Sequence, residues 1–185
     1  TKDFAEQLLI DSEDILRREA QEQGKAPLYD TNDVTEVLKR WKKIGYHEQI
    51  KVNDFLIEFF DAGHILGSSF IAVTTPEGKR VIFSGDLGNL PNPLLRDTEP
   101  IGKADYVLVE STYGDRAHEP MEERTRIFEQ TIKETIKKKG VLMIPAFAME
   151  RTQQLLFELN EMVEQNRIPR VPVFIDSPLA IRLTA

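Results

Sequence analysis

The sequence predicts an α/β protein, and three observations lead to that prediction. Short runs rich in β-branched and aromatic residues alternate with longer segments whose apolar residues recur at helical spacing. Turn-forming residues separate neighbouring runs at distances that suit hairpins. From about residue 120 onward, helical and strand-like segments alternate one for one, which is typical of a parallel sheet.

The first 45 residues are predicted to form two helices. Residues 3–23 carry an apolar stripe at helical spacing, and Gly24 is the expected stop. Thr31 is the expected N-cap of the second helix, which should run to about Lys43.

Four strands are expected next, joined in pairs by tight turns. Asn53-Asp54 and Pro76–Lys79 carry the turn chemistry of two hairpins. The expected strands span residues 49–52, 55–61, 70–75 and 80–84. Proline and asparagine residues then favour a long loop over residues 87–100, and residues 106–110 are predicted to form a short buried strand.

The second half is predicted to begin a separate domain. We place the boundary so that residues 1–118 form the first domain and residues 119–185 belong to the second. The expected elements are a helix over 122–139, a strand over 141–145, a helix over 150–165, a strand over 171–176 and a final helix that begins at Ser177-Pro178.

Composition excludes several classes of function. The net charge is −7 with a pI near 5.1, so a broadly basic nucleic-acid surface is absent. The chain has no cysteine, which excludes thiolate zinc sites and cysteine nucleophiles and fits a reducing cytoplasm, where we expect the protein to reside. No apolar run reaches the roughly 18 residues that span a bilayer, so we expect no membrane association. Nucleotide-binding glycine loops and the serine-hydrolase elbow are also absent.

Three polar side chains stand at the ends of apolar runs, where an α/β sheet presents groups to a ligand. They are His64, Asp86 and Glu110. One imidazole and two carboxylates at such positions indicate a metal-assisted hydrolase, with His64 and Asp86 as metal ligands and Asp86 and Glu110 as catalytic groups. Burial at the end of its strand would raise the pKa of Glu110 unless a partner compensates.

Each of these residues also has a structural interpretation that the sequence leaves open. His64 could bond to backbone, Asp86 could organise its turn, and Glu110 could brace a loop or cap a helix. Arg151 and Ser177 stand at expected helix starts, where anionic substrate groups bind readily, but capping and ion pairing explain them equally well. The other two histidines, His47 and His118, are expected to be solvated surface residues.

Taken together and in this order, five segments resemble the β-CASP branch of the metallo-β-lactamase superfamily, a group of RNA-processing nucleases. The segment around His64 resembles the family's third metal-ligand motif, and the segment around Asp86 resembles the fourth. The segment that begins before Glu110 resembles the first motif peculiar to the β-CASP group. The five segments are residues 60–68, 83–88, 109–116, 144–156 and 174–180.

The resemblance implies a fold, a cofactor and a substrate. The fold would be part of an αββα sandwich followed by the start of a parallel-sheet β-CASP domain. His64 would bind one zinc ion, Asp86 would bridge two, and Glu110 would hold a histidine from a region absent here. The activity would be hydrolysis of RNA phosphodiester bonds, with single-stranded RNA as the expected partner and homodimer formation left open.

The sequence also departs from the family pattern. The H-x-H-x-D-H motif of the family does not occur, and no histidine follows His118. We therefore expect a central fragment that binds zinc weakly and cleaves nothing measurable, since a two-metal site needs more ligands than two. Two alternatives stay open: a non-catalytic binding or scaffold protein that has lost its ligands, and a hydrolase of small esters or thioesters.

Overall fold

A computed structural model of the chain describes residues 2–89 and 91–185. Its contacts divide the chain into two compact units. Unit 1 comprises Thr1–Gly45 and Ile175–Ala185, and unit 2 comprises Tyr46–Phe174. This division by compactness does not coincide with the boundary expected between residues 118 and 119, which stays a prediction.

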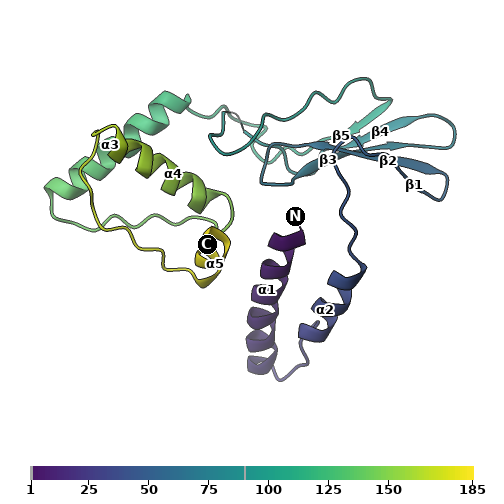
Figure 1. The fold of residues 1–185 in the computed structure, drawn as a ribbon, viewed down its shortest axis with the longest axis horizontal. Helices are drawn as coiled ribbons and strands as arrows, with labels where there is room; N and C mark the ends of the chain where they lie inside the picture. Colours follow the sequence, from purple (N-terminus) through teal and green to yellow (C-terminus); the bar gives the residue numbers. More distant parts are fainter. Residues whose placement is uncertain (1, 90) are drawn as a thin grey trace. The chain divides into compact units, whose positions relative to one another are not determined.

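Unit 2 contains a five-stranded mixed sheet in which the strands lie in chain order (Figure 1). The first three pairings are antiparallel, and only β4 and β5 pair in parallel. The α/β class is therefore confirmed. The strands are β1 Ile50–Val52, β2 Phe55–Asp61, β3 Ser69–Thr74, β4 Arg80–Phe83 and β5 Tyr106–Leu108.

Both predicted hairpins form, and their turn residues explain why. Val52 pairs with Phe55 across the Asn53-Asp54 turn, where Asn53 adopts a φ of 52° that asparagine tolerates. The second turn closes with a hydrogen bond from the Thr75 N–H to the Lys79 carbonyl, and Gly78 supplies its φ of 79°.

The core of the sheet lies on one face of its central strands. Phe70 and Ala72 alternate with half-buried neighbours along β3, and Ile82 on β4 joins them in one cluster. Phe60 from β2 stacks on Phe70 with the ring centroids 5.0 Å apart. This packing fixes the ends of β2 and β4, from which the candidate site projects.

Strand β5 corrects one prediction. The aliphatic run at residues 106–110 indicated a buried strand, but Tyr106 and Val109 are about 60% exposed. The strand lies at the edge of the sheet and pairs only with β4 in the described sheet. An apolar run is buried only where a second layer of structure covers it. In the described part of the chain no second layer covers this run, so its side chains remain exposed.

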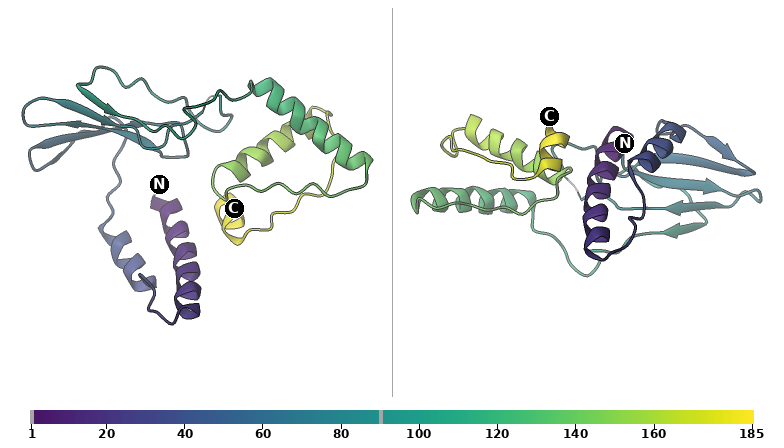
Figure 2. Two further views of the ribbon diagram at one scale, coloured as in Figure 1. Left: turned by 180° about the vertical axis from the view of Figure 1, so that it is seen from behind. Right: turned by 90° about the horizontal axis from the view of Figure 1, so that it is seen from below.

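Two helices form the rest of unit 2, α3 Met121–Lys137 and α4 Arg151–Glu164 (Figure 2). Their cluster is centred on Ile132, Met162 and Ile168, which are at least 95% buried. Arg167 pairs with Glu129 of α3, which ties the end of the helical pair together. Both helices confirm the predicted ones to within a few residues.

The two strands predicted beside these helices do not form. Residues 141–145 and 171–176 have no strand assignment and take part in none of the ladders among the described residues. Their apolar side chains are exposed, with Val141 at 88% and Phe174 at 87%. A strand exists only through hydrogen bonds to a partner strand, so the predicted parallel sheet of this half is absent from the structure.

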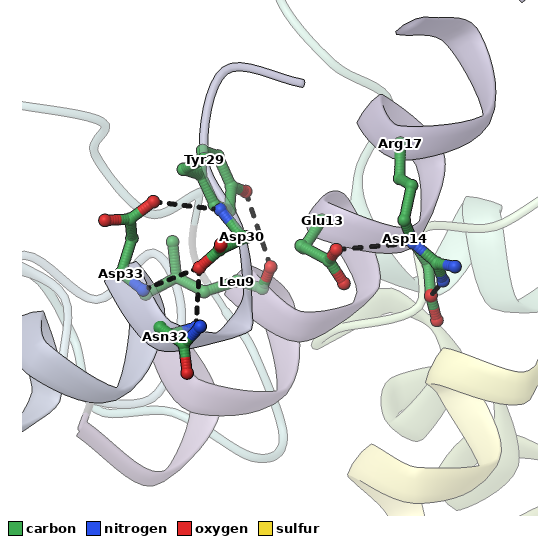
Figure 3. Close-up of polar contacts among 8 residues, drawn as sticks. All are labelled: Leu9, Glu13, Asp14, Arg17, Tyr29, Asp30, Asn32 and Asp33. Carbon is green, nitrogen blue, oxygen red and sulfur yellow. Dashed lines mark hydrogen bonds and ion pairs between the residues drawn. The ribbon is translucent and has the colours of Figure 1, made fainter. Parts of the chain in front are cut away.

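Unit 1 consists of α1 Lys2–Glu22, α2 Thr31–Arg40 and α5 Pro178–Thr184, and α1 contacts both other helices. Asp30, not Thr31, caps α2, because its carboxylate accepts the N–H groups of Asn32 and Asp33 (Figure 3). The helix ends at Arg40, three residues before the predicted end. The Tyr29 hydroxyl also donates to the Leu9 carbonyl, as Figure 3 shows.

None of the described helices combines the length and the apolar character that crossing a bilayer requires.

Candidate functional site

The first part of the site is the turn that follows β2, residues 61–68, which we call the His64 loop. Local hydrogen bonds shape it: the Ser68 hydroxyl accepts the N–H groups of His64 and Ile65 at 3.0 and 3.2 Å. The Asp61 carboxylate accepts the Gly63 N–H at 2.9 Å. The backbone that carries His64 is therefore fixed while its side chain stays 42% exposed.

The second part is the turn after β4, residues 84–88, which we call the Asp86 loop. Buried Ser84 connects this loop to β5, since its N–H donates to the Leu108 carbonyl and its hydroxyl accepts the Glu110 N–H. The Glu110 carboxylate in turn accepts the Leu87 N–H at 2.7 Å. Glu110 thus braces the loop that presents Asp86.

Two glycines hold the His64 and Asp86 loops against each other. The Gly88 N–H donates to the Ala62 carbonyl at 2.8 Å. A Cβ on Gly88 would lie 1.9 Å from the Gly63 carbonyl oxygen, so no other residue fits at this approach. Gly63 has a φ of 61° and packs closely against Arg96 and Thr98. The small residues of both motifs therefore serve loop-to-loop packing.

The structure brings the three predicted side chains together. His64 Nε2 lies 3.9 Å from Asp86 Oδ2. The pKa of Glu110 is lowered, first by the hydrogen bond from the Leu87 N–H, then by Thr112, with the charge of His64 contributing. Burial by itself would raise the pKa of Glu110, but the hydrogen bonds outweigh it. Glu110 therefore has the compensating partners that the sequence could not identify.

Sequence reasoning missed a third carboxylate, that of Glu150 just before α4. It is 9% exposed, and burial raises its pKa, although the Leu66 N–H, the Asn92 side chain and the charges of His64 and Arg151 partly counteract the rise. The sequence held one signal that could have pointed to Glu150: it lies in the segment 144–156, where a strand was expected to lead into a helix. Burial itself could not be foreseen, because the residues that enclose Glu150 come from distant loops.

The two residues predicted to bind substrate, Arg151 and Ser177, both lie at the N-terminus of a helix. Arg151 is the first residue of α4, and its guanidinium donates to Gln154 at 2.9 Å. Ser177 caps α5 by accepting the Ala180 N–H at 3.2 Å. Ser177 belongs to unit 1 and the other site residues to unit 2, so substrate binding by either residue stays a prediction.

The remaining histidines lie outside this constellation. His47 pairs with Glu99 at 3.1 Å and packs edge-on against Phe60. His118 is exposed and contacts the ring of Tyr113. The surface positions expected for both histidines are confirmed, since both are exposed.

The donors at His64 and Asp86 fit a divalent cation, but they are few. Nitrogen and oxygen atoms 3.9 Å apart can both lie about 2.0–2.2 Å from one zinc ion. Among residues 2–89 and 91–185, however, no group of three or more histidine and carboxylate side chains is placed to hold a metal ion. The site offers one imidazole and one carboxylate on two neighbouring loops, and a metal-binding role for them stays a prediction.

Comparison with known proteins identifies related sequences. The chain is 38% identical to Ribonuclease TTHA0252 of Thermus thermophilus over 157 residues, which are 85% of this chain and 36% of the relative. It is 33% identical to Endoribonuclease YSH1 of Kluyveromyces lactis over 165 residues, 86% of this chain and 22% of the relative. It is 29% identical to an RNase J-like protein of Methanocaldococcus jannaschii over 155 residues, 82% of this chain and 37% of the relative.

These alignments leave most of each relative unmatched. The chain spans between about a fifth and two fifths of the length of the three proteins. No family model matches the chain.

Proposed function

Over most of its length the chain is homologous to the β-CASP ribonucleases, and on this premise we propose that it supplies part of a two-zinc centre that hydrolyses RNA phosphodiester bonds. The observation that carries the proposal is the pairing of His64 Nε2 with Asp86 Oδ2 at 3.9 Å, on two loops locked by Gly63 and Gly88. Rigid loops hold ligands in a fixed geometry, which a metal site requires.

In this proposal each side chain has a separate task. His64, through Nε2, and the exposed Asp86 carboxylate would hold the zinc. Glu110 stays ionised, because its pKa is lowered, and keeps the Asp86 loop in place through the Leu87 N–H. The chemistry that bound zinc supplies is a water of lowered pKa and stabilisation of charge on the phosphate oxygens.

The finer features of the fold are part of the same proposal. The mixed sheet is consistent with part of a metallo-β-lactamase sandwich. We propose that residues 141–145 and 171–176 become strands of a parallel β-CASP sheet when partner strands are available. Their exposed apolar side chains support this, since such residues pack well in a covered sheet. We also propose a cytoplasmic location, which the absence of cysteine supports.

Zinc binding tests the proposal on the chain itself. A chromophoric chelator in competition should reveal weak binding that both His64→Ala and Asp86→Ala remove. His118→Ala is the matched control, because that histidine lies in an exposed loop outside the site. Equal affinity in the wild type and in His64→Ala would contradict the proposed ligands.

RNA cleavage is tested best in a chimera. The matched segment of Ribonuclease TTHA0252 would be replaced by residues of this chain, so that the relative supplies the rest of the protein. We expect cleavage of single-stranded RNA that His64→Ala and Asp86→Ala abolish without loss of the fold. A folded chimera that is inactive with wild-type loops would contradict the proposal.

One observation favours a non-catalytic scaffold as the second candidate. The described residues contain no group of three metal-binding side chains, and a protein that has lost its ligands would look the same. The sequence encoded on either side of these residues in the parent gene separates the two functions: an H-x-H-x-D-H motif upstream with further histidines downstream would support the nuclease, and their absence would support the scaffold.

A further inference from the structure

The end of β2 that leads into the His64 loop has no strand partner on its outer edge in the described part of the chain. β1 pairs with β2 only as far as Ile57, although β2 runs on to Asp61. Backbone groups left open in this way need other partners. The His47 N–H donates to the Phe59 carbonyl at 2.9 Å, and Glu99 bonds to Asp61. The segment before β1 and the loop before β5 therefore complete this edge of the sheet, next to the candidate site.

Glu99 binds both backbone groups of Asp61. Its N–H donates to the Asp61 carbonyl, and its Oε1 accepts the Asp61 N–H, each at 3.0 Å. Its second oxygen, Oε2, lies 3.1 Å from His47 Nε2, so both carboxylate oxygens have a partner. A partly exposed pair of this kind contributes little energy by itself. Its effect is to hold the carboxylate in the orientation in which Oε1 faces the Asp61 N–H.

Tyr46 holds the other end of the same loop. Its hydroxyl donates to the Ser68 carbonyl at 2.7 Å, and the Ser68 hydroxyl accepts the N–H of His64. Burial raises the pKa of Tyr46, and the charges of Asp61 and Glu99 raise it further. The hydroxyl therefore keeps its proton at neutral pH and remains a hydrogen-bond donor to the loop.

We propose that Tyr46 and His47 are positioning residues that clamp the His64 loop at both of its ends. The clamp limits the positions that the His64 imidazole can take against Asp86, because a side chain moves with the loop that carries it. The restraint on the loop is independent of any metal. Its effect on zinc affinity depends on the proposed function.

Amide hydrogen exchange provides the first test. In Glu99→Ala, the N–H groups of Gly63 and Gly88 should exchange faster than in the wild type, because both donate to residues at the start of the His64 loop. We expect an increase of about 2- to 10-fold, which is the range that loss of one ordinary hydrogen bond gives. Glu99→Gln should retain slow exchange, because its amide oxygen can still accept the Asp61 N–H. Unchanged exchange in Glu99→Ala would overturn the proposal.

Asp105 provides a matched control at the end of β4 away from the Asp86 loop. Its carboxylate also accepts a backbone N–H, that of Arg80 at 2.9 Å, and also pairs with a cation, Lys79 at 2.9 Å. Its side chain is 35% exposed and that of Glu99 is 30% exposed. Asp105→Ala should therefore lower the midpoint of thermal unfolding about as much as Glu99→Ala and leave exchange at Gly63 unchanged. Faster exchange at Gly63 in Asp105→Ala would mean that the loop responds to any loss of stability, which would refute a clamp.

A double-mutant cycle tests the contribution of His47. His47→Ala leaves the bonds between Glu99 and Asp61 in place, so it should speed exchange at Gly63 less than Glu99→Ala does. In the Glu99→Ala background His47→Ala should add nothing further, because its effect passes through Glu99. Equal effects of His47→Ala in both backgrounds would refute this route. If Glu99→Ala does not fold, unchanged exchange at Gly63 in His47→Ala would overturn the proposal.

The conservative change Tyr46→Phe tests the other end of the clamp. It removes only the hydroxyl that donates to the Ser68 carbonyl. The Ser68 N–H, which donates to the Ile65 carbonyl within the loop, should then exchange faster. Unchanged exchange at Ser68 would refute the part of Tyr46 in the clamp.

Zinc affinity, measured by chelator competition, tests the part that depends on the proposed function. Glu99→Ala should bind zinc at least about 2-fold more weakly than the wild type, and Asp105→Ala should bind it equally well. Wild-type affinity in Glu99→Ala would contradict the positioning of a metal ligand. If His64→Ala also binds zinc like the wild type, the proposed function fails, while the exchange measurements still decide whether the clamp holds the loop.

Discussion

The two site loops and residues 141–145 belong to the same unit, but only the loops have their backbone hydrogen-bond partners in place. The His64 and Asp86 loops are closed by backbone hydrogen bonds, such as that from the Gly88 N–H to the Ala62 carbonyl. Residues 141–145 carry the same kind of strand-forming sequence but lack a ladder, and Val141 is 88% exposed. The difference is that hairpin strands find partners nearby in the sequence, whereas strands joined through helices depend on distant partners.

The comparison predicts that core residues of the sheet carry the stability of unit 2. Phe70→Ala should lower the free energy of unfolding by about 3–5 kcal/mol, because the ring is fully buried and its removal leaves a cavity. Phe174→Ala, at 87% exposure, should change it by less than about 0.5 kcal/mol. Denaturant unfolding followed by circular dichroism measures both. Comparable losses would mean that Phe174 is buried in solution.

Gly88→Ala should produce the next largest effect. The added Cβ would lie 1.9 Å from the Gly63 carbonyl oxygen, so the two site loops must separate, at a cost on the order of 3 kcal/mol. Gly140→Ala is the control, since its nearest neighbours would be 3.7 Å away. Thermal unfolding of the two variants should differ clearly. Equal midpoints would show that the loops are not locked together.

A smaller, pH-dependent effect is expected from Glu110→Gln. The pKa of Glu110 is lower in the folded chain than in the unfolded chain, chiefly through the Leu87 N–H. The ionised group therefore stabilises the fold at neutral pH, and this contribution is lost as the pH falls through the folded-state pKa. The stability difference between wild type and variant should be largest above about pH 5 and shrink in more acidic solution. A difference that is constant with pH would refute this origin.

The smallest effect is expected from Met143→Pro. Proline removes an N–H and breaks a β-ladder, but residues 141–145 take part in no ladder in the described structure. The free energy of unfolding should therefore change by less than about 0.5 kcal/mol. Ala72→Pro in the central strand β3 is the contrasting variant and should prevent the sheet from forming. A large loss in Met143→Pro would indicate that this segment already pairs as a strand.

Much of this arrangement follows from local sequence. Asn53-Asp54 and Pro76–Lys79 specify the two hairpins, and the helical stripes specify α1, α3 and α4, because turn chemistry and periodicity act over a few residues. Strand ends followed by small residues also located His64 and Asp86. Even so, the cap of α2 fell one residue earlier than predicted, at Asp30.

The tertiary structure decided whatever depends on residues that are distant in the chain. The low pKa of Glu110 requires the Leu87 N–H, and the burial of Glu150 requires loops some 60 to 80 residues earlier. The exposure of β5 and of residues 141–145 likewise reflects which layers and strands are present to cover them. By itself the sequence determined which segments prefer helix or strand and which side chains stand at strand ends. Only the tertiary structure decided which side chains are buried, which charges interact and which strands pair. Each of these depends on two segments that meet in the fold, so one segment's sequence cannot determine it.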